Sequence, residues 1–459
     1  LISSGFKLPP KRITVNLAPA DLPKSGGRYD LPIAIGILLA TDQIQVADIS
    51  QFEFFGELAL TGELRSIKGG ISSLLAANSD NKKIILPATN LNEARLLIQT
   101  YPDLKENLYL VNDLREACQV LLGEPLGCLS EDDYAFTFKK GAYYAQDLAD
   151  VRGQAGAKRA LEIAASGQHS MMMVGPPGSG KSMLASRLIT ILPDLTADEA
   201  IDVANIRSIA GQQIAEESFY SRPFIHPHHT ASAAAMVGGG SSPKPGALSL
   251  AHNGVLFLDE LPEFERKVLD SLREPMETGV VTISRAARQM EFPSQFQLIA
   301  ALNPSPTGSH TDKRATPDQV LRYLSRVSGP FIDRIDLQIE LPRLTSSQLQ
   351  STQVEESSEQ VRARVERAYA IQLNRQGKVN ARLNNKEMSI HCELAAAELQ
   401  FLAKASEKLA LSPRSYHRVI KVARTISDLK AQPAITLNEL KEALNYRAFE
   451  RLISQLTQY

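Results

Sequence analysis

The segment GPPGSGKS, residues 175–182, is the feature that most constrains how this chain can fold. It completes the pattern G-x-x-x-x-G-K-[ST] at Gly175, Gly180, Lys181 and Ser182. An apolar run typical of a buried strand (MMMV) precedes it, and a helix-compatible run follows it. In such a loop, glycines let backbone N–H groups turn inward around phosphates, and the helix N-terminus adds its positive end. The segment therefore predicts a nucleotide-binding α/β domain with a parallel sheet.

We expect this loop to bind ATP. Lys181 would reach the β- and γ-phosphates, and the hydroxyl of Ser182 would bind Mg²⁺. The expected ATP contacts are the whole loop and one residue at the start of the same domain: Gly175, Pro176, Pro177, Gly178, Ser179, Gly180, Lys181, Ser182 and Val151. The alternative is a chance glycine loop, which the strand before it and the helix after it argue against.

Two further apolar strands end in polar residues. The run VLFLDE ends in Asp259, which suits Mg²⁺ through water, and Glu260, which is placed to polarise the attacking water as general base. The alternative is a strand that simply ends at solvent. The run LIAALNP ends at Asn303, which would orient that water or, alternatively, would cap the turn before Pro304. Together with the glycine loop, these residues predict hydrolysis of ATP.

The 459 residues suggest about three domains. Residues 1–123 alternate strand-like runs, such as KRITVNLAPA (11–20) and KKIILPA, with helix-compatible ones, which predicts an α/β or α+β domain. We read 124–150 as a linker and 151–343 as the nucleotide-binding core. Residues 344–459 carry almost no strand signal, which predicts a helical lid domain. Its expected helices cover 355–376, 390–410, 413–430 and 437–458.

Composition limits the partners and the location. The net charge of −1 gives no bulk basic field, so any DNA binding requires a local patch. No apolar run approaches the ~18 residues of a membrane span, and the three cysteines are not spaced as a metal site. We therefore expect a cytoplasmic protein with reduced thiols. Because the sequence starts at Leu1 inside a strand-like pattern, we also expect that N-terminal residues are missing.

Arg334 stands in the run GPFIDRIDLQIELP, between Asp333 and Asp336. One interpretation is a surface salt bridge to either acid. The other is an arginine finger that a subunit supplies to the γ-phosphate of its neighbour. The second interpretation requires a ring of subunits.

The order of these motifs resembles that of the AAA+ ATPases, with Walker A, Walker B, sensor 1, a finger and a helical lid. The segment 276–296 looks like the presensor-1 β-hairpin of the magnesium-chelatase-like and MCM-like branch. Ser412-Pro413-Arg414 at a helix start resembles sensor 2, which makes Arg414 a candidate γ-phosphate contact. Its alternative is an ordinary arginine at a helix N-terminus.

Longer stretches, among them RPFIHPHHTASAAAMVGGG and LSPRSYHRVIKVARTISDL, resemble the ComM/YifB proteins, which are bacterial magnesium-chelatase-like ATPases. The resemblance covers nearly the whole chain. It implies a homo-hexameric DNA helicase, with the arginine finger in trans, that promotes branch migration of recombination intermediates in natural transformation. A chelatase-type ATPase that remodels a partner protein is the alternative.

Contacts with single-stranded or branched DNA are expected from loops in the pore of such a ring. Arg285 and Arg288 lie near the predicted hairpin tip among small residues, and Lys244 follows a run of mobile glycines, 238–240. The alternative for the hairpin is an exposed turn with solubilising charge.

Residues 1–123 resemble the Lon-protease-type domain, an α+β fold like S5 domain 2, through GELALTGELRSIKGG and IILPATN. The positions of the Lon serine and lysine fall on Arg28 and near Ser72, so we expect a non-proteolytic relative.

Two departures from the ComM/YifB pattern concern possible metal sites and contacts. The stretch after Asn303 lacks the cysteines of many relatives, so we expect no zinc there. Ile225 replaces a frequent arginine. For His226, His228 and His229 we favour a structural or inter-subunit role over metal binding.

Overall fold

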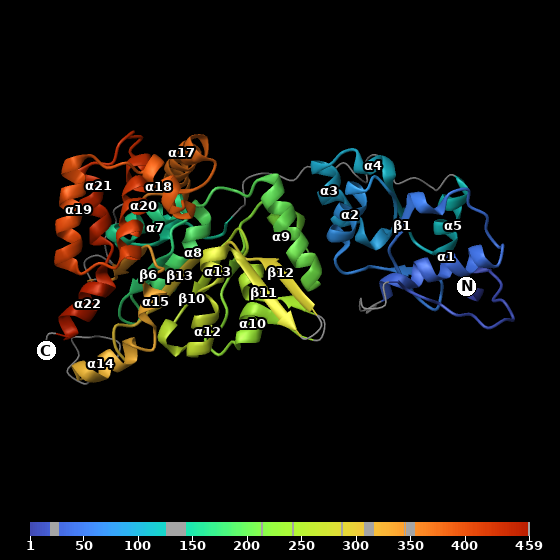
Figure 1. Cartoon of the computed structure of the whole chain (residues 1–459), viewed down its shortest axis with the longest axis horizontal. Helices are drawn as coiled ribbons and strands as arrows, with labels where there is room; N and C mark the ends of the chain where they lie inside the picture. Colours follow the sequence, from blue (N-terminus) through green and yellow to red (C-terminus); the bar gives the residue numbers. More distant parts are fainter. Residues whose placement is uncertain are drawn as a thin grey trace. The chain divides into compact units, whose positions relative to one another are not determined.

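A computed structural model describes residues 1–18, 27–124, 144–212, 214–240, 243–285, 288–306, 316–343, 345 and 354–457. The chain forms two compact units (Figure 1). The first comprises Leu1–Ala142 and Leu195–Ser221, and the second comprises Tyr143–Asp194 and Arg222–Tyr459. These units differ from the predicted domains in two respects: a segment of the predicted core packs with the first unit, and the helical region packs with the core. Most of the predicted linker lies outside the described residues.

A five-stranded parallel sheet organises the second unit, in the order β14-β6-β13-β10-β7. Its strands are β6 (Met171–Val174), β7 (Phe224–Ile225), β10 (Val255–Leu258), β13 (Gln297–Leu302) and β14 (Leu337–Glu340). The four residues of β6 and of β10 are all buried, as are the six of β13. Such continuous apolar runs are typical of a parallel sheet covered on both faces, so the predicted core fold is confirmed.

Helices from both parts of the second unit share one hydrophobic core with this sheet. They are α7 (Ala155–Gly167), α8 (Lys181–Ile191), α17 (Ser358–Gln376) and α20 (Pro413–Leu429), and α7 contacts each of the other three. Phe257 and Ile299 from the sheet pack in this core with Val365 of α17 and Ile426 of α20. The C-terminal helices are therefore part of the same packed unit as the nucleotide-binding core.

The helical C-terminal region is confirmed, but two of its predicted helices are broken. The remaining helices are α18 (Asn385–His391), α19 (Ala396–Leu409), α21 (Leu437–Asn445) and α22 (Ala448–Thr457). The break between α21 and α22 falls at Arg447, which forms a β-bridge with Gln338 of β14. The Arg447 guanidinium donates to the backbone oxygen of Ile335 (2.9 Å), so tertiary contacts with the sheet edge end the helix.

The first unit is built on a three-stranded parallel sheet, β1 (Phe52–Phe54), β4 (Lys83–Pro87) and β5 (Leu108–Val111). Side chains of β4 alternate between two cores: Ile85 packs with α1 (Asp30–Ala40) and α5 (Leu114–Leu122), while Ile84 packs with α2 and α3. The predicted strand at 11–20 is wrong for the described residues up to 18. There Ile13 and Val15 are exposed and no neighbouring strand pairs with them.

Helix α9 (Ala197–Ala210) follows α8 in sequence but packs in the first unit against α2 (Gly70–Ser79) and α3 (Leu91–Thr100). Its Ile201 and Val203 are buried in the same core as Leu74 of α2 and Leu97 of α3. The first unit therefore takes part of its core from the middle of the chain.

Short elements complete the described part of the chain. The hairpins are β2 (Glu57–Leu58) with β3 (Leu64–Arg65), β8 (Gly238–Gly239) with β9 (Lys244–Pro245), and β11 (Val280–Arg285) with β12 (Arg288–Pro293). The short α-helices are α4 (Leu104–Asn107), α10 (Ala233–Val237), α11 (Ala247–Leu250), α12 (Arg266–Ser271), α13 (Pro275–Thr278), α14 (Pro317–Leu324) and α15 (Gly329–Ile332). Across the described ranges, no helix combines the length and the apolar character needed to cross a membrane.

We expect Arg447→Ala to lower the free energy of unfolding of the second unit by about 3 kcal/mol, because buried hydrogen-bond acceptors lose their donor. Arg447 is 1% exposed and also donates to the Ser415 hydroxyl (2.7 Å). Urea unfolding followed by far-ultraviolet circular dichroism measures the change. Lys404→Ala, an exposed position on α19, is the control. Equal unfolding midpoints for the two variants would contradict this view of Arg447.

Candidate nucleotide site

The predicted phosphate loop lies between β6 and α8, and its conformation requires glycine. Gly178 and Gly180 have φ angles of +76° and +87°, which residues with a Cβ rarely adopt. At Gly175, a Cβ would lie 2.7 Å from the backbone oxygen of Leu341. The loop is therefore held in a left-handed turn that passes close to the segment after β14.

Lys181 is fixed at the centre of the loop. Its Nζ atom donates to the backbone oxygens of Gly175 (2.7 Å) and Pro176 (3.1 Å) and to Oδ1 of Asn303 (3.0 Å). Desolvation by burial lowers the pKa of Lys181, while the carboxylates of Asp259 and Glu260 oppose this shift. A buried ammonium between carbonyls and carboxylates is positioned for an anionic group.

The predicted magnesium ligands lie together. The Ser182 hydroxyl donates to Oδ2 of Asp259 at 2.6 Å, and these two oxygens are hard ligands of the kind that Mg²⁺ uses together with phosphate oxygens and water. In the same loop, the buried Ser179 hydroxyl has no hydrogen-bond partner. These groups fit Mg²⁺ and a phosphate, which would supply the missing ligands and partners. Among the residues that the structure describes, no set of three or more His, Cys, Asp or Glu side chains forms a metal cluster.

Val151 lies in the buried core of the second unit, just after the 3₁₀ turn Leu148–Asp150. Three residues later, Gln154 donates from Nε2 to the backbone oxygen of Ser179 at 3.2 Å. This hydrogen bond connects the phosphate loop to the start of the second unit, where Val151 lies.

Glu260 has a partner that the sequence did not suggest. Its Oε2 atom lies 3.0 Å from Nδ1 of His229, and its backbone has a φ of +53°, unusual for a residue other than glycine. His229 follows β7, which pairs with β10, so two segments distant in sequence end side by side. Because β7 has only two residues, no periodicity in the sequence signals that it neighbours β10.

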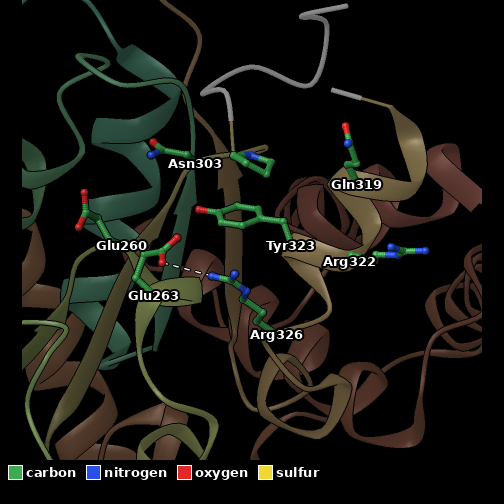
Figure 2. A pocket seen from close by; sticks show the side chains of 8 residues that line it. Glu260, Glu263, Asn303, Gln319, Arg322, Tyr323 and Arg326 are labelled. Atoms are coloured by element: carbon green, nitrogen blue, oxygen red, sulfur yellow. Dashed lines mark hydrogen bonds and ion pairs between the residues drawn. The ribbon is translucent and has the colours of Figure 1, made fainter. Parts of the chain in front are cut away.

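A cavity of about 590 Å³ opens beside these strand ends (Figure 2). Glu260 and Asn303 line one side, and α14 with the residues after it lines the other, where the Tyr323 hydroxyl points toward the strand ends. Burial raises the pKa of Tyr323 to about 12, and Glu263 and Glu260 add to this effect. Arg326 pairs with Glu263 across the cavity (3.2 Å). No sequence motif indicated the side formed by α14.

Arg334 and Arg414 do not join this site. Arg334 precedes β14 and so lies at the amino edge of the sheet, whereas Lys181 and Glu260 follow strands at the carboxyl edge. Arg334 is 6% exposed, and its Nη2 atom forms an ion pair with Oε1 of Glu277 (2.8 Å) rather than with Asp333 or Asp336. The predicted alternative of a surface salt bridge to those acids is therefore wrong. Arg414, in the first turn of α20, contacts the same Glu277 oxygen at 3.3 Å.

The segment predicted as a presensor-1 hairpin is a hairpin, and Arg285 pairs with Arg288 at the end of its ladder. Residues 286 and 287 lie outside the described residues. Lys244 is exposed on β9 opposite Gly239. At Gly238, a Cβ would lie 2.3 Å from the backbone oxygen of Lys244, so this glycine is needed for close strand approach rather than only for mobility.

The positions that correspond to the Lon dyad lie close together in the first unit. Arg28 donates to the backbone oxygen of Lys68 (3.0 Å), next to the glycine pair at the start of α2. Ser72 donates to Asn205 of α9 (2.5 Å), so its hydroxyl already has a partner. Most of the cysteine-free stretch after Asn303, from 307 to 315, lies outside the described residues.

Three regions of the chain match models of known protein families. Residues 147–349 match "Magnesium chelatase, subunit ChlI", residues 1–90 match "Subunit ChlI of Mg-chelatase", and residues 355–447 match "Magnesium chelatase, subunit ChlI C-terminal". The protein named Competence protein ComM of Haemophilus influenzae is 50% identical over 100% of this chain and 89% of its own. The chain belongs to the ComM/YifB subfamily of magnesium-chelatase-like AAA+ ATPases.

Two other relatives show how far this similarity extends. The Uncharacterized protein YifB of Escherichia coli is 46% identical over 99% of this chain and 89% of its own. The Magnesium-chelatase 67 kDa subunit of Chlorobaculum parvum is 29% identical over 34% of this chain and 23% of its own. Membership of the ComM/YifB subfamily implies the use of a nucleotide and Mg²⁺, which the residues around Lys181 fit.

In Glu260→Gln, we expect ATP hydrolysis to fall by about 100-fold or more, because an amide does not accept the proton of the attacking water. ATP affinity should stay near that of the unaltered protein, since the phosphate loop is intact. Steady-state phosphate release and equilibrium binding of ATP measure the two effects. The control is Glu265→Gln, an exposed carboxylate close by in sequence. Unchanged hydrolysis in Glu260→Gln would exclude Glu260 as the base.

Proposed function

We propose that this protein is an ATP-driven motor that acts on branched or single-stranded DNA as a homo-hexameric ring. It promotes branch migration of recombination intermediates in natural transformation. It works in the cytoplasm, where both ATP and DNA are present. The observation that carries the proposal is the placement of two sets of residues at opposite edges of one sheet. Lys181 and Glu260 follow strands at the carboxyl edge, and Arg334 precedes one at the amino edge. Head-to-tail contacts between identical subunits would join the two edges and close a ring.

Two observations favour DNA as the substrate. The relative that is 50% identical over the whole chain is named a competence protein. The hairpin β11–β12 ends in the arginine pair Arg285 and Arg288, and Lys244 is exposed on a second hairpin. Arginine and lysine on hairpins suit contacts with phosphates that do not depend on sequence. With a net charge of −1, such local contacts would supply the binding.

A second candidate is a chelatase-type ATPase that remodels a partner protein. The matches to magnesium chelatase families and to the 67 kDa chelatase subunit favour it. The two candidates differ in whether DNA stimulates ATP hydrolysis. Stimulation by DNA and movement of a branch support the motor, and their absence supports the remodelling ATPase.

We expect the protein to convert a four-way DNA junction to duplex products only with hydrolysable ATP. In the double variant Arg285→Ala with Arg288→Ala, DNA-stimulated hydrolysis should fall at least about tenfold. The plot of log K for DNA binding against log salt concentration should have a slope that is less steep by about 2. The control, Lys404→Ala with Lys408→Ala, removes the same charge from exposed positions on α19. If the arginine variant keeps full DNA stimulation, the hairpin is not the DNA contact.

If Arg334 acts in trans, mixing two inactive variants should restore activity. Glu260→Gln lacks the base but keeps Arg334, and Arg334→Ala keeps the base. In an equimolar mixture, about a quarter of the inter-subunit sites hold both intact groups. Phosphate release by the mixture should therefore approach that fraction of the unaltered rate. A mixture no more active than either variant alone would mean that Arg334 does not complete a neighbour's site.

A further inference from the structure

One carboxylate oxygen contacts both Arg334, the proposed trans finger, and Arg414, the candidate γ-phosphate contact. Oε1 of Glu277 lies 2.8 Å from Nη2 of Arg334 and 3.3 Å from Nη2 of Arg414. Glu277 belongs to α13, Arg334 to the turn before β14, and Arg414 to the first turn of α20. Three elements that are distant in sequence thus meet at a single charged atom, which no motif in the sequence indicated.

The charges around Arg334 require a counter-ion. Desolvation lowers the pKa of Arg334 most, and the guanidinium groups of Arg414, Arg273 and Arg418 lower it further, whereas Glu277 raises it. Arg418 has its own acid, since it forms an ion pair with Asp336 at 2.5 Å. Glu277 is therefore the carboxylate that offsets the repulsion between Arg334 and Arg414.

Arg334 is held at two points. Its Nη1 atom donates to the backbone oxygen of Pro330 (2.5 Å), its Nη2 atom faces Glu277, and its buried Nε atom has no hydrogen-bond partner. Arg414 is 53% exposed, and its Nη2 atom forms an ion pair with Oε1 of Glu277 at 3.3 Å. Arg334 and Glu277 line a cavity of about 610 Å³, and the Arg414 side chain is largely exposed. Without Glu277, the repelled guanidinium groups have room to separate.

We propose that Glu277 is a positioning residue that holds Arg334 and Arg414 as one pair for the γ-phosphate of the neighbouring subunit. This inference rests on the proposed trans arrangement. Carboxylates and phosphoryl groups accept guanidinium donors in the same geometry, so two arginines arranged around one carboxylate oxygen are already arranged for a phosphoryl oxygen. Glu277 itself stays outside the phosphate loop, at the amino edge of the sheet.

The test uses Glu277→Gln in the full chain, with Glu274→Gln as the matched control. Glu274 is exposed and lies one turn earlier beside the same helix. We expect kcat for ATP hydrolysis to fall about tenfold in Glu277→Gln with KM for ATP unchanged, because ATP is bound by the loop at the other edge. The control should retain both constants. A kcat equal to that of the unaltered protein, or a higher one, would overturn the proposal, the latter because Glu277 would then be withholding the arginines.

Non-additivity separates positioning from a general structural effect. If Glu277 acts through the two arginines, then adding Glu277→Gln to a variant that already carries Arg334→Ala and Arg414→Ala should cause no further loss of activity. If Glu277→Gln lowers the activity of that variant further, Glu277 does not act through the arginines. Should Glu277→Gln lower the thermal midpoint, Glu277→Asp keeps the charge on a shorter side chain. The kcat of Glu277→Asp should also fall at constant KM, because the shorter side chain does not reach both arginines. An unaltered kcat in Glu277→Asp would contradict the proposed positioning role.

The same set of variants separates this inference from the proposed function. If Arg334→Ala and Arg414→Ala both keep full activity, the trans half-site itself is wrong. If both lose activity while Glu277→Gln does not, the half-site stands and only the role of Glu277 is refuted.

Discussion

The parallel pairing of β6 with β13 on one side and β14 on the other is the constraint on which the second unit depends. In this register Val174 lies opposite both Leu302 and Glu340. The residues that follow the strands, Gly175 and Asn303, are therefore brought to one edge, where Lys181 connects them. Because all five strands run in the same direction, the opposite edge collects the residues that precede strands. One sheet thus carries two chemically different edges.

Asp336 connects the second of these edges to the helical region. Its carboxylate accepts from the backbone N–H of Ser170 (2.9 Å) and from Arg418 of α20 (2.5 Å), and His169 lies 3.5 Å away. Burial alone would raise the pKa of Asp336, but Arg418 and His169 hold it far below its usual range. Arg414 lies one turn before Arg418, so this buried ion pair also places Arg414 near the sheet edge. Packing of α20 and placement of Arg414 have the same physical cause.

The segment 195–221 gives the chain its second constraint. It leaves the second unit after α8 and returns at β7, yet α9 is buried in the first unit, where Ser208 donates to Glu93 of α3 (2.5 Å). Desolvation raises the pKa of Glu93, against the effect of its hydrogen bonds with Ser208 and Asn90. A carboxyl group buried in this way ties α9 to α3. The chain between the phosphate loop and the strand before His229 thus contributes to the folding of the other unit.

The sequence by itself indicated the buried strands of the second unit, its helical region and the polar residues at the strand ends. Buried strands followed by glycine, acid or amide are local patterns, so the phosphate loop, Asp259, Glu260 and Asn303 could all be predicted from the sequence. Tertiary structure alone decided which side chains meet across distant segments: His229 with Glu260, and Arg334 and Arg414 with Glu277. Strand order and helix packing set these contacts, and neither leaves a periodic signal in the sequence. The break at Arg447 has the same origin, because a buried guanidinium bound to backbone oxygens outweighs helix propensity.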